Sequence, residues 1–299
     1  MSDRRVIKFG DAGGGEARSL ELTEEAFTPT AGEVVVRTSS SLLDPLTLAD
    51  SDDEDSLEVS FSGVISALDG VASDELAVGD TVFGVGPPAD FVSLPAAELE
   101  RAPGGAPLEP HQAAAIPYLC SFWEALNTIA PDSSARILIS GQPVVRHLAA
   151  QLVRSLLPEM SLTEADFGSI AELPSELDQP FDILIHGVGD PDDLQLSLSA
   201  VDLDGRAFLL VPPGEHVLSH DFYPSLHRSC LRSLVRRVGR PCRPASCPDP
   251  GHRALYERLA QGEIDVEPVI SHAASTADLA DLALGREPAA GKLVSLAWP

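Results

Sequence analysis

A short apolar segment that ends at a glycine and leads into a helix restricts the fold of this chain more than any other feature. Residues 136–140 (RILIS) are apolar without alternation, as a strand buried on both faces requires, and Gly141 follows them. Residues 147–157 (HLAAQLVRSLL) then have helical spacing and stop at Pro158. Two further runs, 181–186 (FDILIH) and 207–211 (AFLLV), also lack alternation. The middle third is therefore predicted to be α/β with a parallel sheet.

The first hundred residues have a different texture. Short β-rich segments alternate there with glycine or proline turns, which predicts an all-β or barrel-like module. These segments are residues 33–38, 58–68, 80–83 and 91–94. Near the other end, residues 276–284 suggest a short helix, and residues 292–297 a final strand that could return to join the first module.

The net charge of −26 limits the partners of this chain. A strongly negative surface repels phosphate backbones and anionic lipid headgroups, so we expect neither nucleic acid nor a membrane as partner. No apolar run long enough to span a bilayer occurs, which indicates a cytoplasmic protein. A cluster of arginines between residues 228 and 243 opposes the overall charge; it could serve an anionic ligand, or form a helix that pairs with the chain's own carboxylates.

The cysteine pattern does not predict a disulfide framework or a metal site. A cytoplasmic setting would keep the four cysteines reduced. They are Cys120, Cys230, Cys242 and Cys247. The last two are close in sequence but have no second ligand pair at useful spacing, His252 being the nearest addition, so no metal is expected.

Several segments together resemble the medium-chain dehydrogenase/reductase superfamily, in its zinc-free quinone oxidoreductase and enoyl reductase branch. The resemblance extends over almost the whole chain, and the order and spacing of the segments make it specific. The segments are residues 31–37 (AGEVVVR), 41–48 (SLLDPLTL), 78–84 (VGDTVFG), 113–126 (AAAIPYLCSFWEAL), 262–270 and 291–296.

The resemblance implies an α/β plus β architecture of two domains. A GroES-like catalytic domain would comprise residues 1–115 and 270–299, and a Rossmann-like domain would comprise residues 116–269, shortened around 158–180. Zinc-dependent relatives have a cysteine and a Gly-His-Glu group in the catalytic cleft, where this chain has Ser41 and the segment before Phe61. Catalytic zinc is therefore not expected.

The turn after residues 136–140 departs from the dinucleotide-binding fingerprint of the family. That fingerprint requires three glycines, for a tight turn, for close approach of the pyrophosphate and for helix packing. Only Gly141 matches, while Pro143 and Arg146 stand at the other two positions. Pro143 lacks an N–H, and Arg146 could block the site, extend into solvent, or instead pair with a phosphate.

The interval after the helix also departs from the family. Only residues 158–180 separate it from the strand at 181–186, about half of what the family has there. Residues 160–163 could still form the second strand, which would place Glu164 or Asp166 near the ribose position.

Five side chains are candidates for catalysis, and the resemblance implies a cleft between the domains for them. Asp44 would lie on its floor next to Thr47, which is not itself a catalytic candidate, with Tyr118 and Cys120 entering from the helix between the domains. His186, at the end of a parallel strand, is the preferred general acid or base because its ordinary pKa lies near neutrality. Each also has a structural alternative as a packed or hydrogen-bonded side chain.

The fifth candidate follows the strand at 207–211. Tyr223, flanked by His220 and His227, would border the substrate cleft in the family, or else lie in a surface loop. The five catalytic candidates are thus His186, Tyr118, Asp44, Cys120 and Tyr223.

Three functions remain open from the sequence. The first is an enzyme that has lost ordinary NAD(P)H redox chemistry and uses acid/base chemistry, such as cyclisation, dehydration or isomerisation, on a small organic substrate. The second is a zinc-independent NADPH-dependent enoyl or quinone reductase, and the third a non-catalytic binding or partner subunit. The resemblance also implies a homodimer paired through the edge of the Rossmann sheet.

Overall fold

The computed structural model consists of two compact units, which are described separately. The first comprises Met1–Cys120 and Pro241–Pro299, and the second comprises Ser121–Arg240. The structure describes residues 2–10, 19–45, 57–68, 70, 75–104, 107–129, 134–166, 180–189, 191–211, 232–238, 241–244, 251–273, 278–279 and 292–298.

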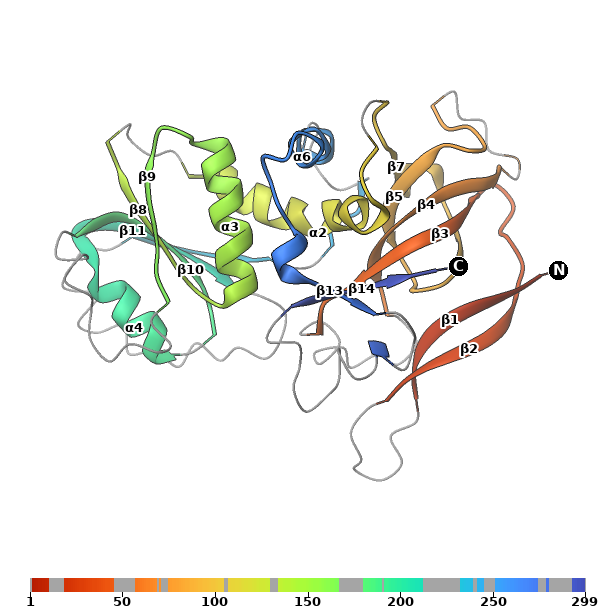
Figure 1. Cartoon of the computed structure of the whole chain (residues 1–299), viewed down its shortest axis with the longest axis horizontal. Helices are drawn as coiled ribbons and strands as arrows, with labels where there is room; N and C mark the ends of the chain where they lie inside the picture. The colour runs from red at the N-terminus through yellow and green to blue at the C-terminus, as the bar shows by residue number, and fades with distance from the viewer. Residues whose placement is uncertain are drawn as a thin grey trace. The chain divides into compact units, whose positions relative to one another are not determined.

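A seven-stranded sheet forms the centre of the first unit (Figure 1). Its order is β13-β14-β3-β4-β5-β7, with β6 paired to β3 off this path. The strands are β3 (Val34–Leu43), β4 (Val59–Leu68), β5 (Thr81–Gly86), β6 (Phe91–Leu94), β7 (Leu99–Arg101), β13 (Ile270–Ala273) and β14 (Leu293–Ala297). Because β14 pairs antiparallel with β3, the predicted return of the last strand to the first module is confirmed.

A two-stranded hairpin, which sequence analysis did not predict, precedes this sheet. Strands β1 (Ser2–Gly10) and β2 (Ser19–Phe27) pair antiparallel, and one bridge links Val6 to Ala89. Charged residues at many positions of both strands conceal the alternation that would otherwise predict them. Val6 and Phe27 are nevertheless buried.

The segment before residue 270, which contains helix α6 (Gly251–Ala260), belongs to the first unit. Its His252 and Tyr256 rings lie 5.8 and 6.5 Å from the ring of Phe83 on β5. The predicted domain boundary at 269/270 therefore differs from the division at 240/241. The other division, at 120/121, falls within α2 (Pro110–Asn127), as does the predicted boundary at 115/116.

A five-stranded parallel sheet forms the second unit, as the non-alternating apolar runs predicted. Its order is β12-β11-β10-β8-β9. The elements are β8 (Arg136–Gly141), α3 (Pro143–Leu156), β9 (Ser161–Glu164), β10 (Phe181–Gly187), α4 (Pro191–Ser199), β11 (Val201–Val211) and β12 (Arg232–Arg237). Figure 1 shows α3 and α4 beside the strands that they follow.

The β9 edge of this sheet is shortened relative to a Rossmann sheet. In the order 3-2-1-4-5-6 of that fold, β8 takes position 1, β9 position 2, and β10 to β12 positions 4 to 6. Among the residues that the structure describes, no strand pairs with the outer side of β9. Strand β9 confirms the predicted second strand at 160–163, shifted by one residue.

The described part of the arginine cluster is not a helix. Residues 232–237 form strand β12, which pairs in parallel with β11. The expected pairing with carboxylates does occur at one member: Arg243 binds Glu98 at 3.0 Å and also Glu58. Arg228 and Arg240 lie outside the described residues.

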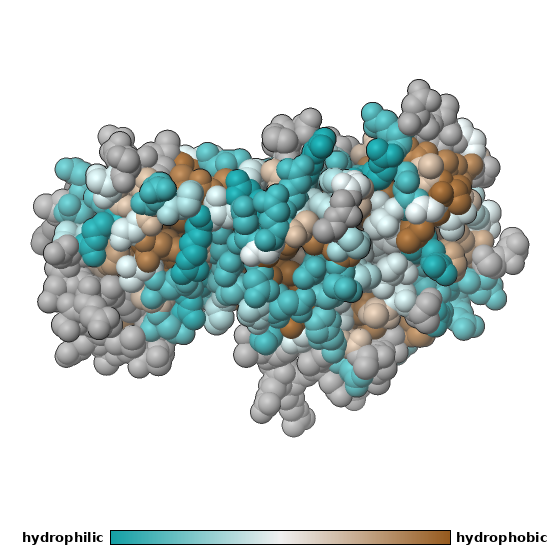
Figure 2. Space-filling model, turned by 45° about the horizontal axis from the view of Figure 1, so that its top comes forward, coloured by the Kyte–Doolittle hydropathy of each residue, from teal (hydrophilic) through white to brown (hydrophobic). Residues whose placement is uncertain are grey.

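The surface agrees with a strongly charged chain. On the face drawn in Figure 2, apolar residues form separate patches among hydrophilic ones. Among the described residues, the exposed large apolar side chains are Leu22, Val78 and Val235. Within the same residues, no helix has the length and apolar character needed to cross a membrane.

Two glycines meet at the carboxyl ends of β8 and β10. Gly141 has a φ of 92°, and a Cβ on it would lie 2.0 Å from the carbonyl oxygen of Gly187. A Cβ on Gly187 would lie 2.7 Å from Cβ of Val145, in the first turn of α3. The start of α3 therefore approaches the sheet so closely that neither position tolerates a side chain.

We expect Gly141→Ala to lower the free energy of unfolding by about 3–5 kcal/mol, because the positive φ and the steric overlap add. Gly32→Ala is the matched control, since Gly32 has a φ of 87° but no atom within 4 Å of an added Cβ. It should lose about 1–2 kcal/mol. If urea unfolding showed the same loss of unfolding free energy in both variants, the contact with Gly187 would contribute nothing to stability.

Candidate functional site

The amino end of α3 is where the fold would place a dinucleotide, since a helix N-terminus offers free N–H groups to a pyrophosphate. Here the N–H of Gln142 donates to the carbonyl oxygen of Gly187 at 3.0 Å. The next residue, Pro143, has no N–H and is the first residue of the helix. The first two positions after the glycine turn therefore offer no donor to a phosphate.

Arg146 bridges the first turn of α3 to the end of β9. Its guanidinium donates to a carboxylate oxygen of Asp166 at 3.0 Å and to the carbonyl oxygen of Ala165 at 3.2 Å. The side chain is only 19% exposed, so it is neither extended into solvent nor free to meet a phosphate. About two turns further along α3, Arg154 binds Glu164.

These contacts do not fit a dinucleotide bound in the usual way. The acidic residue after the second strand normally receives the ribose hydroxyls. Both predicted ribose candidates, Glu164 and Asp166, are instead bound by arginines of α3. Arg146 also occupies the position at which the fingerprint requires a third glycine.

His186 lies beneath α4, in a buried chain of hydrogen bonds. Its Nδ1 is 2.9 Å from Oγ of Ser140 on β8, which is 2.8 Å from Oγ of Ser197 on α4. Ser197 donates to the carbonyl oxygen of Asp193 at 2.7 Å, with Oδ1 of the same residue at 3.3 Å. Ser197 has one proton to give, so it accepts from Ser140, which in turn accepts from Nδ1–H of His186.

This direction of donation leaves Nε2 of His186 as a bare acceptor. No described residue donates to it, and the ring is 0% exposed. Burial lowers the pKa of His186 to about 4, so the ring is neutral at pH 7. The sequence predicts that His186 faces the crevice at the end of the sheet. Alternation along β10 instead turns His186 toward α4 and places Gly187 on the side of α3. Its acid/base role stays a prediction.

Asp44 and Tyr118 form a hydrogen-bonded pair in the first unit. Asp44 follows β3 directly and is half-buried, and the phenol of Tyr118, on α2, donates to its Oδ2 at 3.0 Å. Burial first, and then the charge and hydrogen bond of Asp44, raise the pKa of Tyr118 well above its ordinary value of 10. The phenol therefore stays protonated and is suited to orienting the carboxylate.

Cys120 is not the free thiol that sequence analysis assumed. It is 0% exposed and disulfide-bonded, so it has no thiolate to act as a nucleophile, and the expectation that all four cysteines are reduced is wrong for this one. Sequence spacing could not show this, because only the fold brings distant cysteines together. Cys242, by contrast, is not in a disulfide.

The remaining predicted positions divide into two groups. Ser41, where zinc-dependent relatives have a ligand, is buried and its Oγ accepts a hydrogen bond from Nε1 of Trp298 at 2.9 Å. The other group lies outside the described residues, and its roles stay predictions. These residues are Thr47, His220, Tyr223 and His227.

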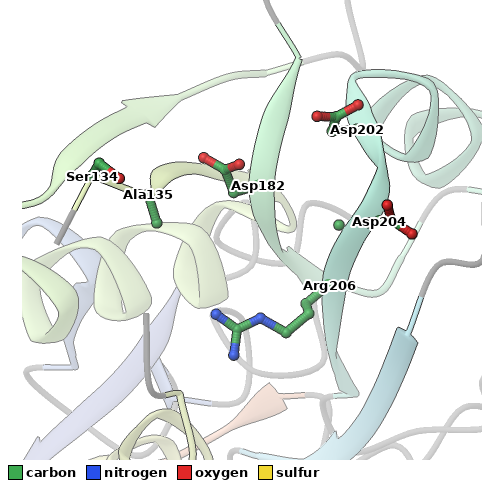
Figure 3. Close-up of a pocket in the computed structure, with 7 residues that line it drawn as sticks. Ser134, Ala135, Asp182, Asp202, Asp204 and Arg206 are labelled. Carbon is green, nitrogen blue, oxygen red and sulfur yellow. The ribbon is translucent and has the colours of Figure 1, made fainter. Parts of the chain in front are cut away.

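None of the predicted site residues lines either of two cavities in the described part of the chain. The cavity in Figure 3, about 210 Å³, is lined by Asp182, Asp202, Asp204 and Arg206 among others. It lies at the amino ends of β10 and β11, whereas ligands of parallel α/β sheets bind at the carboxyl ends. The other, about 570 Å³ in the first unit, includes Arg101 and Arg253 in its lining.

Comparison with known proteins identifies the fold. No family model matches the chain, and no curated protein matches it by sequence. A zinc-binding dehydrogenase of Sinorhizobium meliloti bound to NADP is similar in structure, with a TM-score of 0.76 and 16% identity over 100% of both chains. Galactitol-1-phosphate dehydrogenase of Escherichia coli has a TM-score of 0.75 at 16% identity, covering 98% of this chain and 100% of its own.

A third similar structure is an NADPH:quinone reductase of Bacillus thuringiensis, with a TM-score of 0.72 and 16% identity over 100% of both chains. These likenesses show that the chain has the medium-chain dehydrogenase/reductase fold, with a GroES-like and a Rossmann-like part, as its sequence resemblance implied.

The structure thus pairs Asp44 with Tyr118, ties Arg146 to Asp166 and encloses His186. Sequence analysis missed Ser140, Ser197 and Asp193, because hydroxyl groups on a strand and a helix give no signal of a shared network. It also missed a group of three side chains in the first unit, His111, Glu267 and His272. These lie close together, although His111 and Glu267 are separated by 156 residues.

Acidification should destabilise the protein through two buried histidines. Burial lowers the pKa of both His186 and His252 to about 4. The unfolded chain gains a proton on each below about pH 6.5, and the folded chain does so only near 4. Their contribution is thus complete above about pH 6.5 and is lost as the pH falls toward 4, at up to about 1.4 kcal/mol per pH unit for each.

Urea unfolding between pH 7.5 and 4.5 tests this dependence. His186→Gln, whose amide can still bind Ser140, should lose about one histidine's share of the pH slope, His252→Gln another, and the double variant both. A pH slope that stays at the wild-type value in His186→Gln would contradict the assignment.

Proposed function

We propose that this chain is an enzyme of the medium-chain dehydrogenase/reductase fold that does not use NAD(P)H in the ordinary way. The observation that carries the proposal is the amino end of α3. There Gln142 gives its N–H to Gly187, Pro143 has none, and Arg146 is tied to Asp166. Donors for a pyrophosphate are thus missing at this turn, and the acidic residue expected to bind a ribose is engaged by Arg146.

The chemistry left to such an enzyme is proton transfer, and Asp44 is the side chain best suited to it in the described structure. A half-buried carboxylate next to a neutral phenol can accept a proton from a substrate carbon or hydroxyl and return it elsewhere. Tyr118, which is 3% exposed, orients Asp44 rather than meeting the substrate. Cyclisation, dehydration or isomerisation of a small organic substrate would need only these transfers.

A second function, a zinc-independent NADPH-dependent reductase, is favoured by the fold alone. One similar structure is of a dehydrogenase bound to NADP and another is of an NADPH:quinone reductase. In such an enzyme, bound NADPH would supply hydride, and the amino end of α3 would have to receive its phosphates.

The first test is calorimetric titration of NADPH and NADH into the protein. We expect no binding at millimolar cofactor. The N–H donors of residues 142 and 143 are not available to a phosphate, and Arg146 stands where the fingerprint requires its third glycine. Pro143→Gly combined with Arg146→Gly, which restores both glycines, should increase NADPH affinity by about tenfold or more, a gain of about 1.4 kcal/mol. Arg154→Ala is the matched control, since it breaks the other ion pair between α3 and β9. Micromolar binding to the wild-type chain would exclude the proposal.

The second test is cofactor-free exchange of carbon-bound hydrogen with deuterium oxide, followed by NMR on a panel of small carbonyl compounds. Asp44→Asn should slow exchange roughly 10²–10⁴-fold, the range typical of a lost general base. Tyr118→Phe should have a smaller effect, because the carboxylate remains. Asp182→Asn, at the unrelated cavity, serves as control. Exchange that is equally fast in Asp44→Asn and in wild type would rule out the assigned base.

A further inference from the structure

Three metal-binding side chains meet in the first unit, away from any residue discussed for catalysis above. Nε2 of His111 contacts one oxygen of Glu267, and Nε2 of His272 lies 3.5 Å from the other. The two imidazole rings are 4.8 Å apart and at right angles. One ligand atom from each side chain lies within 4.8 Å of the other two.

Regular structure fixes all three donors. His111 is the second residue of α2 (Pro110–Asn127), Glu267 opens the 3-10 helix η4 (Glu267–Val269), and His272 belongs to β13. Strand β13 is held by β14, on which Ser295 is the partner of His272. The backbone of Glu267 is also fixed, because its N–H donates to Oδ1 of Asp265 at 3.0 Å.

The carboxylate of Glu267 lies at the centre of the group. His111 contacts one of its oxygens and His272 lies near the other. Nε2 of Gln112 donates to the same carboxylate at 3.4 Å and so helps to orient it.

We propose that His111, Glu267 and His272 bind a zinc ion. Two imidazoles and one carboxylate form a donor set that zinc uses in proteins, with three protein ligands and a fourth position for water. Zinc bonds of about 2.0–2.2 Å in a tetrahedron place neighbouring donors roughly 3.3–3.5 Å apart, close to the separation of His272 and Glu267.

Binding requires one local change. The proton shared in the contact between His111 and Glu267 leaves to solvent, and the two side chains separate to admit the ion. Access is open, since the side chains of Glu267 and His272 are 45% and 54% exposed. The bound zinc joins the start of α2 to the segment that leads into β13, and so cross-links two parts of the chain that are distant in sequence.

This inference does not depend on the proposed function, because none of the three residues takes part in it. The sequence predicts no metal here, because ligands at short spacing are the usual signal of a site and two of these side chains are 156 residues apart.

The test is equilibrium dialysis of the chelator-treated full chain against zinc, followed by metal analysis, together with thermal melts. Wild type should bind one zinc per chain at this site, and a large excess of zinc over its Kd should raise the Tm by about 2–6 °C. His272→Ala removes the most exposed ligand, so the chain should still fold. It should weaken zinc binding by at least about tenfold and abolish the shift in Tm.

Glu267→Gln, which keeps the size of the side chain, should weaken binding in the same way, whereas His147→Ala, a histidine on α3, should bind zinc like wild type. The melt without zinc verifies that each variant folds. Absence of zinc binding by wild type, or unchanged affinity in both His272→Ala and Glu267→Gln, would overturn the proposal.

Discussion

The close approach of Gly141 and Gly187 is the contact on which the second unit depends. Two parallel strands end side by side there, and α3 begins against them with no room for a Cβ at either position. The hydrogen bond from Gln142 to the oxygen of Gly187 fixes the turn further. This contact keeps the strand, turn and helix geometry of a Rossmann unit after most of its glycines have been replaced.

The same contact explains how the fold and the cofactor site can diverge. The first glycine of the fingerprint serves the turn itself, so the fold requires it whether or not a dinucleotide binds. The later glycines serve the ligand and the approach of the helix. With Arg146 at the last position, an ion pair to Asp166 connects α3 to β9. At the end of β9, the carboxylate that would otherwise bind a ribose is thereby bound by an arginine of the protein itself.

The polar groups of the two units differ in their access to solvent. In the second unit, His186 and its serine partners lie between the sheet and α4, where a neutral ring is stable and a charged one is not. In the first unit, Asp44 is half-buried, and Glu267 and His272 are more exposed. Groups that must exchange protons or receive an ion need that exposure, so the first unit has the better candidates for function.

The sequence by itself determined the order of the elements and the class of the fold. Non-alternating apolar runs at 136–140 and 181–186 predicted buried parallel strands, and the loss of two glycines predicted an altered cofactor turn. Both signals are local in the chain, since strand burial and turn chemistry are recorded in consecutive residues. The strand β12 was missed because its arginines outweigh two apolar residues, and only pairing with β11 makes it a strand.

Tertiary structure alone decided which side chains meet. The ion pair of Arg146 with Asp166, the burial of His186 by α4, the disulfide of Cys120 and the contact of His111 with Glu267 all join residues from different elements. The identity of a residue gives its chemistry, but its partners depend on how strands and helices pack. The separation of two residues along the chain carries no signal that they meet in the fold. This is why His186 can be predicted as a catalyst and yet lie buried beneath α4.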